Sequence, residues 1–382
     1  MISRPALATN SAAILAYEVL LVRLFAIVQW HHFAFMAISV ALLGFGISGT
    51  LLGLAREWML RRAHAVFTAS AMLFGFAAPA AFLVAQTLPF NALEVVWAPW
   101  QLLYLGVIYL LLAVPFTAGA TCIGIAFLIC GTAVSRVYLW NLLGSGVGAL
   151  GIVAALFALP PVACLALTGL LGVAAAALEA VVRAPELRFR ALAAVVSFAV
   201  AVLVVGHRPW MQLQISEYKD LSQALAVGDA RLMIERSGPL ALLSVVESPE
   251  VPFRYAPGLS LLSPALPPPQ LGIFADGESA GAINVWEGRP DSLAYLDMST
   301  DALAYHLTSL PEVLVLGAGG GRLAYQAVGH DARRIDVVEP NPDLLRLVQE
   351  DFADSAGHLY DRPEVDTYAT DPRRFLTGAS HR

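Results

Sequence analysis

The stretch from Pro311 to Pro342, PEVLVLGAGGGRLAYQAVGHDARRIDVVEPNP, decides the fold of the second half of the chain. It opens with the largely apolar run Glu312–Leu316, which is typical of a buried parallel strand. That run stops at positions 317–321, where four of the five residues are glycine. A short strand that ends at a glycine-rich turn predicts a place where the backbone approaches a ligand closely.

A helix and a second strand are predicted after this turn. Residues 322–328 predict the helix, and Gly329 is placed to cap its C-terminus. Residues 335–338 predict the strand, which ends at Glu339, about twenty residues beyond the first glycine. This order of strand, glycine turn, helix, strand and acid predicts a nucleotide-binding α/β unit. A glycine-rich turn in an unrelated α/β domain is the alternative interpretation.

The expected ligand of this unit contains a nucleoside. The N–H groups at the start of the helix would point toward it, and the carboxylate of Glu339 would accept hydrogen bonds from a ribose diol. NAD and FAD are disfavoured because Arg322 stands where a dinucleotide fingerprint has its third glycine. Most nucleoside-binding methyltransferases carry an acid two residues before the first glycine, and this chain has Val315 there, so it departs from their usual pattern.

The segment VLVLGAGGG at 313–321, followed by VVEPNP at 337–342, resembles the spermidine synthase family, whose members read much like VLVIGGGDGG and then VEID. The resemblance implies a Rossmann-like, doubly wound fold with decarboxylated S-adenosylmethionine or S-adenosylmethionine as substrate. It also implies that Asp371, in TDPRRFL at 370–376, holds the adenine amino group and that Asn341 lies near the ribose. The cofactor-binding residues predicted in this way are Gly317, Gly319, Gly321, Glu339, Asn341 and Asp371.

The chain departs from the family's pattern at several points. Gly320 stands where the family's loop commonly has Asp, and Asp297 is only a weak match for a family acid. The family's catalytic aspartate would lie beyond Arg382, so no catalytic residue is assigned, and the chain is expected to be C-terminally incomplete and inactive as it stands. Asp371 also fits a helix N-cap before Pro372, a role that is compatible with adenine binding.

Composition indicates a membrane protein. The chain is 58% hydrophobic and 14% charged, and its mean hydropathy is +0.68. The apolar excess lies in residues 1–206, which predict a multi-pass transmembrane module without a cleavable signal peptide. Residues 207–298 predict a linker and a β-hairpin subdomain, with hairpins at 231–247 and 271–286, and residues 299–382 predict a partial nucleoside-binding α/β domain.

A helix needs about 20 apolar residues to cross a bilayer, and seven segments meet that length or come close to it. The predicted spans are Leu7–Val28, Phe33–Leu54, Ala63–Leu88, Gln101–Val134, Tyr138–Leu159, Val162–Val182 and Ala191–Gly206. Pro115 would kink or divide the fourth of them, which gives an alternative of eight helices. With the N-terminus inside, seven helices give a larger excess of arginine in the cytoplasmic loops than eight helices do. Seven helices, however, place the C-terminal domain on the side of the membrane away from cytosolic cofactors. We expect a bacterial inner-membrane protein with a cytosolic C-terminal domain, on the chemical argument.

Three features of the membrane module stand out. Glu18 and Arg23 are ionisable residues inside the first span, where such groups are either functional or structurally paired. They lie about 140° apart around a helix, so they are poorly placed to pair with each other. The small residues that follow Asn141, at 144–148, predict close helix packing. These segments resemble the membrane module of bacterial membrane-bound spermidine synthase-like proteins.

The resemblance implies an aminopropyltransferase that acts on a polyamine or another small acceptor. A methyltransferase that uses S-adenosylmethionine is one alternative, and a polyamine or nucleoside transporter or sensor without turnover is another. The other expected partner is the lipid bilayer, and homo-oligomerisation is left open. The net charge of −6 gives no support for nucleic-acid binding. No metal is expected, because the sequence has no zinc spacing and its cysteines, Cys122, Cys130 and Cys164, lie in apolar runs.

Overall fold

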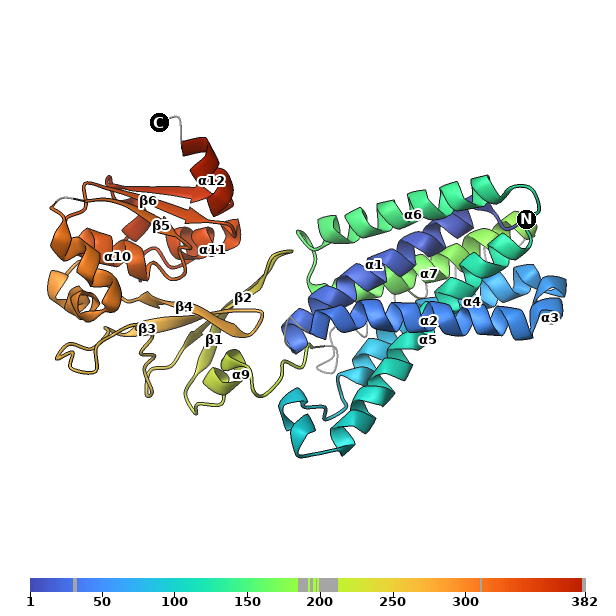
Figure 1. Cartoon of the computed structure of the whole chain (residues 1–382), viewed down its shortest axis with the longest axis horizontal. Helices are drawn as coiled ribbons and strands as arrows, with labels where there is room; N and C mark the ends of the chain where they lie inside the picture. The colour runs from blue at the N-terminus through green and yellow to red at the C-terminus, as the bar shows by residue number, and fades with distance from the viewer. Residues whose placement is uncertain are drawn as a thin grey trace. The chain divides into compact units, whose positions relative to one another are not determined.

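The structure is a computed structural model of the chain and describes residues 1–29, 33–184, 192, 195–196, 198, 212–309 and 311–379. The chain forms two compact units, Met1–Ser216 and Glu217–Arg382 (Figure 1). The first unit is helical, and the second contains the strands of the described chain.

Six helices in the first unit are long and apolar enough to cross a membrane. They are α1 (Arg4–Val28), α2 (Ala34–Leu54), α4 (Ala63–Ala85), α5 (Trp100–Leu128), α6 (Val134–Ala155) and α7 (Pro161–Arg183). The short helix α3 (Arg56–Arg61) and the 3₁₀ turn η2 (Ala92–Val96) lie between them. The predicted seventh span, Ala191–Gly206, falls almost entirely outside the described residues.

The structure does not show the alternative in which the segment 101–134 divides into two membrane-spanning helices. Helix α5 runs without a break from Trp100 to Leu128 and carries Pro115 in its interior. Proline is tolerated inside membrane helices because neighbouring helices and side-chain hydroxyls compensate for the lost backbone hydrogen bond. Pro115 is buried among the other helices, so packing holds the helix continuous there.

Helix α1 is the centre of the bundle. In its most apolar stretch of 18 residues, 72% of the residues are buried, whereas the buried share of the corresponding stretch is 22–56% in the other five helices. It packs against α2, α5, α6 and α7, and Tyr17 contacts two aromatic rings on other helices. The Tyr17 ring lies edge-on to Phe74 of α4, with centroids 5.9 Å apart, and tilted against Phe116 of α5 at 5.2 Å.

Helix α6 approaches α1 through glycine, as the small residues after Asn141 predict. A Cβ atom at Gly144 would overlap the backbone of Ala8, and one at Gly148 would overlap that of Ala12. Only glycine permits this approach, and Ser11 of α1 also donates a 2.8 Å hydrogen bond to Oδ1 of Asn141.

A buried carboxylate ties together three helices at one end of this unit. Glu179 of α7 is 1% exposed, and its Oε1 lies 2.6 Å from Nδ1 of His64 at the start of α4. Its Oε2 accepts a 2.8 Å hydrogen bond from the backbone N–H of Ser3, directly before α1. Because an unpartnered buried carboxylate is costly, these contacts fix the ends of α1, α4 and α7 relative to one another.

The second unit begins with a small antiparallel sheet in the order β1-β2-β3-β4. Its elements are the short helix α9 (Asp220–Leu225) and strands β1 (Arg231–Ser237), β2 (Leu242–Glu247), β3 (Gln270–Ala275) and β4 (Glu278–Asn284). Both predicted hairpins are present, and pairing of β2 with β3 joins them into one sheet. Asp276 and Gly277 form the β3–β4 turn with φ of 52° and 82°, as a two-residue hairpin loop requires.

A parallel sheet in the order β5-β6-β7 follows. Its strands are β5 (Glu312–Leu316), β6 (Arg334–Glu339) and β7 (Val365–Ala369). The helical elements of this part of the chain are η5 (Pro290–Met298), η6 (Thr300–Leu307), α10 (Arg322–Gly329), α11 (Pro342–Arg346), η7 (Leu347–Asp351), η8 (Leu359–Asp361) and α12 (Pro372–Ala379). Both sheets share one apolar core, which includes Leu243, Ile283, Val315, Tyr325 and Val337.

Strand β5 has one free edge and one uncovered face in the described part of the chain. It pairs with β6 along one edge only, and Leu314 and Leu316 are 41% and 46% exposed. Strands of parallel sheets are normally buried on both faces, so these leucines mark an uncovered face.

We predict that the α1–α6 contact tolerates no side chain at Gly148. Gly148→Ala should lower the free energy of unfolding by about 1–3 kcal/mol, because the methyl group meets backbone that cannot move away. Thermal unfolding of the protein in detergent measures this. A Cβ at Gly146 would meet nothing within 4 Å, so Gly146→Ala is the matched control and should be neutral or stabilising, by up to about 1 kcal/mol. Equal unfolding temperatures for the two variants would contradict the glycine contact.

Candidate functional site

The predicted site residues gather at the carboxyl ends of the three parallel strands. The glycine turn at 317–321 follows β5, Glu339 is the last residue of β6, and Asp371 lies two residues beyond β7. In parallel α/β sheets this edge is where ligands bind. The structure therefore brings the sequence-predicted residues to one edge of the sheet.

Left-handed backbone conformations explain why three positions of the turn are occupied by glycine. Gly317, Gly319 and Gly321 have φ of 90°, 52° and 90°, a region in which a side chain is strained. A Cβ at Gly317 would meet nothing within 4 Å, so this glycine borders open space. Gly317 is thus the residue of the turn whose backbone an incoming ligand can approach.

Gly320 has a different role. A Cβ there would overlap the carbonyl group of Ala282 in β4, so the glycine turn is packed directly against the small antiparallel sheet. Gly281, the residue before Ala282 in β4, also lies against the turn: a Cβ there would be 3.1 Å from the backbone nitrogen of Gly320. The spermidine synthase family commonly has Asp at the position of Gly320, and in this chain β4 occupies the space that such a side chain needs.

The carboxylate of Glu339 fastens the turn to the strand beside it. Its Oε2 accepts a 2.9 Å hydrogen bond from the backbone N–H of Ala318, and its Oε1 accepts one of 2.9 Å from that of Asn341. The side chain is buried, with 6% exposure. Each carboxylate oxygen keeps a second lone pair, so a ribose hydroxyl can still donate to the same group.

Asn341 and Asp371 are both helix caps. Oδ1 of Asn341 accepts a 3.1 Å hydrogen bond from the backbone N–H of Asp343 and begins α11. Oδ1 of Asp371 accepts bonds of 2.8 and 3.2 Å from the N–H groups of Arg373 and Arg374, which confirms the predicted N-cap. Asp371 is exposed, so its second oxygen faces solvent at the edge of the sheet.

Sequence reasoning missed Tyr360, which lies beside the glycine turn. A Cβ at Gly321 would be 3.6 Å from the Tyr360 hydroxyl, which is buried and has no hydrogen-bond partner among the described residues. Burial raises the pKa of Tyr360, and the negative charge of Glu339 raises it further. The hydroxyl therefore remains a neutral donor at physiological pH. No spacing in the sequence links residue 360 to the turn, because the contact forms only when η8 folds against it.

Other predicted candidates lie elsewhere. Asp297 is not at the glycine turn but next to the opposite end of α10, with His306 and His330. Glu18 is half-buried on α1, and Arg23 is buried on the same helix, with 9% exposure.

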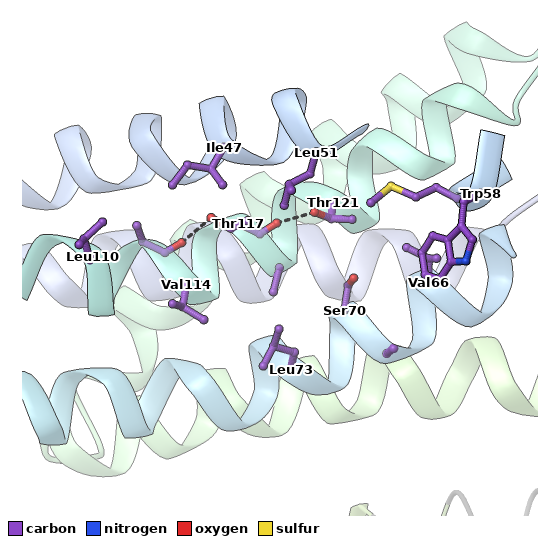
Figure 2. A pocket seen from close by; sticks show the side chains of 14 residues that line it. Ile47, Leu51, Trp58, Val66, Ser70, Leu73, Leu110, Val114, Thr117 and Thr121 are labelled. Carbon is purple, nitrogen blue, oxygen red and sulfur yellow. Dashed lines mark hydrogen bonds between the residues drawn. The ribbon is translucent and has the colours of Figure 1, made fainter. Parts of the chain in front are cut away.

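The helical unit contains an apolar cleft between α2, α4 and α5 (Figure 2). Its volume is about 580 Å³, and Ile47, Leu51, Leu73, Leu110 and Val114 are among the residues that line it. Two threonine hydroxyls in the lining are bonded within their own helix, since Thr117 donates to the carbonyl of Ala113 and Thr121 to that of Thr117. A cleft lined mainly by apolar side chains suits hydrocarbon.

Comparison with known proteins identifies no relative: no family model matches the chain, and no curated protein or solved structure does so either. The motif at 313–342 and the geometry of the edge therefore carry the functional argument.

We predict that the glycine turn depends on its contact with β4. Gly320→Ala should open the turn and speed amide hydrogen exchange across residues 317–321, because the methyl group would overlap the carbonyl of Ala282. Exchange followed by mass spectrometry measures this peptide by peptide. Gly329→Ala is the control, since a Cβ at Gly329 meets nothing within 4 Å. Unchanged protection in the Gly320 variant would show that the turn does not rely on β4.

Proposed function

We propose that the edge formed by the glycine turn, Glu339 and Asp371 binds the adenosine part of decarboxylated S-adenosylmethionine or S-adenosylmethionine. The observation that carries this proposal is the open glycine, Gly317, next to a carboxylate that the following strand holds in place. Gly317 lets a ligand reach the backbone, and Glu339 offers the acceptors that a ribose diol needs. Asp371, two residues beyond β7, offers an acceptor for the adenine amino group.

The reaction that we propose is aminopropyl transfer to a polyamine. An amine nitrogen attacks the carbon next to the sulfonium, and 5′-methylthioadenosine leaves with the electron pair of the broken carbon–sulfur bond. The protein's contribution to such a transfer is to hold the nitrogen and the carbon in line and to take the proton from the amine. No residue of this chain is assigned to the proton transfer.

The acidic edge favours the decarboxylated donor over S-adenosylmethionine. Glu339 and Asp371 both carry a carboxylate at this edge, and S-adenosylmethionine adds a carboxylate that the decarboxylated compound lacks. The decarboxylated compound therefore carries the larger net positive charge, which an edge with two carboxylates attracts more strongly. This difference in charge supports the aminopropyl donor over the methyl donor.

The membrane unit is proposed to hold this domain at a bacterial inner membrane, with the domain in the cytosol. Six apolar helices support insertion in a membrane. The cytosolic side follows from the ligand, because nucleoside thioethers and polyamines are cytosolic metabolites.

We expect 5′-methylthioadenosine to bind the full chain and Glu339→Ala to abolish that binding. The substitution removes both the ribose acceptor and the two hydrogen bonds that hold the turn. Isothermal titration calorimetry in detergent measures it. Glu339→Gln keeps one carbonyl acceptor and should weaken binding about tenfold or more, the loss of at least one charge-assisted hydrogen bond. Asp336→Asn, on the same strand and paired with Arg334 instead, is the control and should bind like wild type. Unchanged binding in Glu339→Ala would refute the site.

Competition should separate the two donors. We expect decarboxylated S-adenosylmethionine to displace 5′-methylthioadenosine at several-fold lower concentration than S-adenosylmethionine, because of the carboxylates at the edge. S-adenosylhomocysteine serves as the methyltransferase probe. Tighter binding of S-adenosylmethionine and S-adenosylhomocysteine would favour the methyltransferase alternative over aminopropyl transfer.

A further inference from the structure

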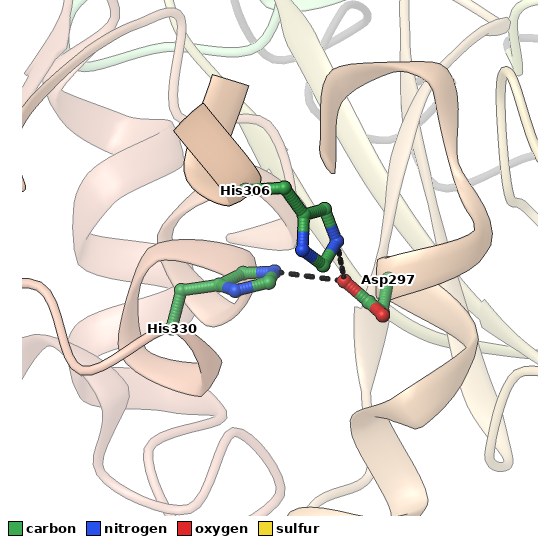
Figure 3. Close-up of side chains that lie close together, drawn as sticks. All are labelled: Asp297, His306 and His330. Atoms are coloured by element: carbon green, nitrogen blue, oxygen red, sulfur yellow. Dashed lines mark hydrogen bonds and ion pairs between the residues drawn. The ribbon is translucent and has the colours of Figure 1, made fainter. Parts of the chain in front are cut away.

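Three side chains meet next to the end of α10 opposite the glycine turn. Asp297 is near the end of η5, His306 near the end of η6, and His330 directly follows α10. Nε2 of His306 lies 2.7 Å from Oδ1 of Asp297, and Nε2 of His330 lies 3.2 Å from the same oxygen. Figure 3 shows the two imidazole rings directed at this carboxylate from separate segments.

We propose that Asp297, His306 and His330 form a binding site for a divalent first-row transition-metal ion. One carboxylate oxygen and two imidazole nitrogens, all within 4.8 Å of one another, offer a set of ligands that suits zinc, cobalt, nickel or iron(II). Metal–ligand bonds of about 2.0–2.2 Å place neighbouring ligand atoms roughly 3–3.5 Å apart. The two separations from Asp297 lie close to that range, so binding requires only small side-chain movements.

The surroundings hold the ligands in place without a metal. Nε2 of Gln326, one turn before His330, donates a 3.0 Å hydrogen bond to the carbonyl of Leu296 and one of 3.1 Å to the hydroxyl of Ser299. These buried bonds join α10 to η5 on either side of Asp297. The ring of Tyr305 stacks on that of His330, with centroids 4.6 Å apart and planes 9° apart. Such support of the ligand orientation is what a metal site needs.

The site opens onto a cavity of about 580 Å³. Asp297, His306 and His330 line it, together with Gln326 and Arg362. Oε1 of Gln326 is buried and accepts no hydrogen bond from any described residue. Three protein ligands with space beside them leave a coordination position for water or for a small molecule. This position, beside the far end of an eight-residue helix, lies roughly 12 Å from the glycine turn.

The sequence suggested no metal because these ligands have no recognisable spacing. They are 9 and 24 residues apart, and three different segments bring them together. The proposal is independent of nucleoside binding, since it shares no residue with the glycine turn, Glu339 or Asp371.

The test titrates metal into the full chain, purified in detergent through a tag free of histidine and stripped with a chelator. We expect the wild-type chain to bind one more Zn²⁺ than Asp297→Asn, His306→Gln or His330→Gln, with affinity at this site reduced at least about tenfold in each variant. Competition with a chromophoric chelator measures the affinity. Co²⁺ should give visible absorption bands in the wild type that each variant loses. Asp297→Asn retains an oxygen that can accept hydrogen bonds from both histidines. This variant therefore distinguishes a loss of metal binding from a loss of the folded structure.

His358→Gln is the matched control. His358 also has two aspartate partners, but Asp354 lies at its Nε2 and Asp361 at its Nδ1, so the three cannot converge on one ion. This variant should bind metal as the wild type does. Equal Zn²⁺ stoichiometry and affinity in the wild type and the three cluster variants would overturn the proposal. A loss of binding in His358→Gln that matches theirs would overturn it as well.

Discussion

Close approach between backbones, which only glycine permits, is the constraint on which both units of this protein depend. In the helical unit, Gly144 and Gly148 let α6 lie directly against α1, the most buried helix of the bundle. In the second unit, Gly320 lets the turn after β5 lie against β4. A methyl group at any of these positions would meet backbone, which cannot rotate away as a side chain can. The same feature therefore orders helices in an apolar bundle and fixes a loop at the edge of a sheet.

Glu339 links this packing to the proposed chemistry. Its two oxygens hold the glycine turn and the start of the next segment through backbone N–H groups, so the carboxylate is part of the fold before any ligand arrives. A group positioned in this way loses little conformational freedom when it binds a ribose, which favours affinity. It also means that removing Glu339 changes both the ligand contact and the turn, which is why the glutamine substitution and a control on the same strand are needed together.

Helix α10 connects two regions of different chemistry. Its N-terminus follows the glycine turn, where carboxylates and open backbone form the proposed nucleoside site. Its C-terminus is followed by His330, which meets Asp297 and His306 beside a cavity. Buried Gln326 and the ion pair of Arg322 with Asp301 fix the helix to η5 and η6 between these regions. A metal ion bound at the C-terminal end of α10 would hold η5 and η6, the segments that also position the N-terminal end of this helix.

The sequence by itself determined the elements that depend on local pattern. Long, nearly uncharged runs predicted the six long apolar helices of the described residues, because a bilayer demands length and apolarity that few other structures need. Turn residues and short apolar runs predicted the hairpins, and the order of strand, glycines, helix and acid predicted β5, α10 and β6 and the edge of the sheet at which they meet. Only the tertiary structure decided what depends on neighbours distant in sequence. It kept α5 whole across Pro115, paired β2 with β3, placed β4 over Gly320, brought Tyr360 to the turn, and joined Asp297 to His306 and His330. These contacts arise from packing between segments, and packing leaves no periodic trace in the sequence of either partner.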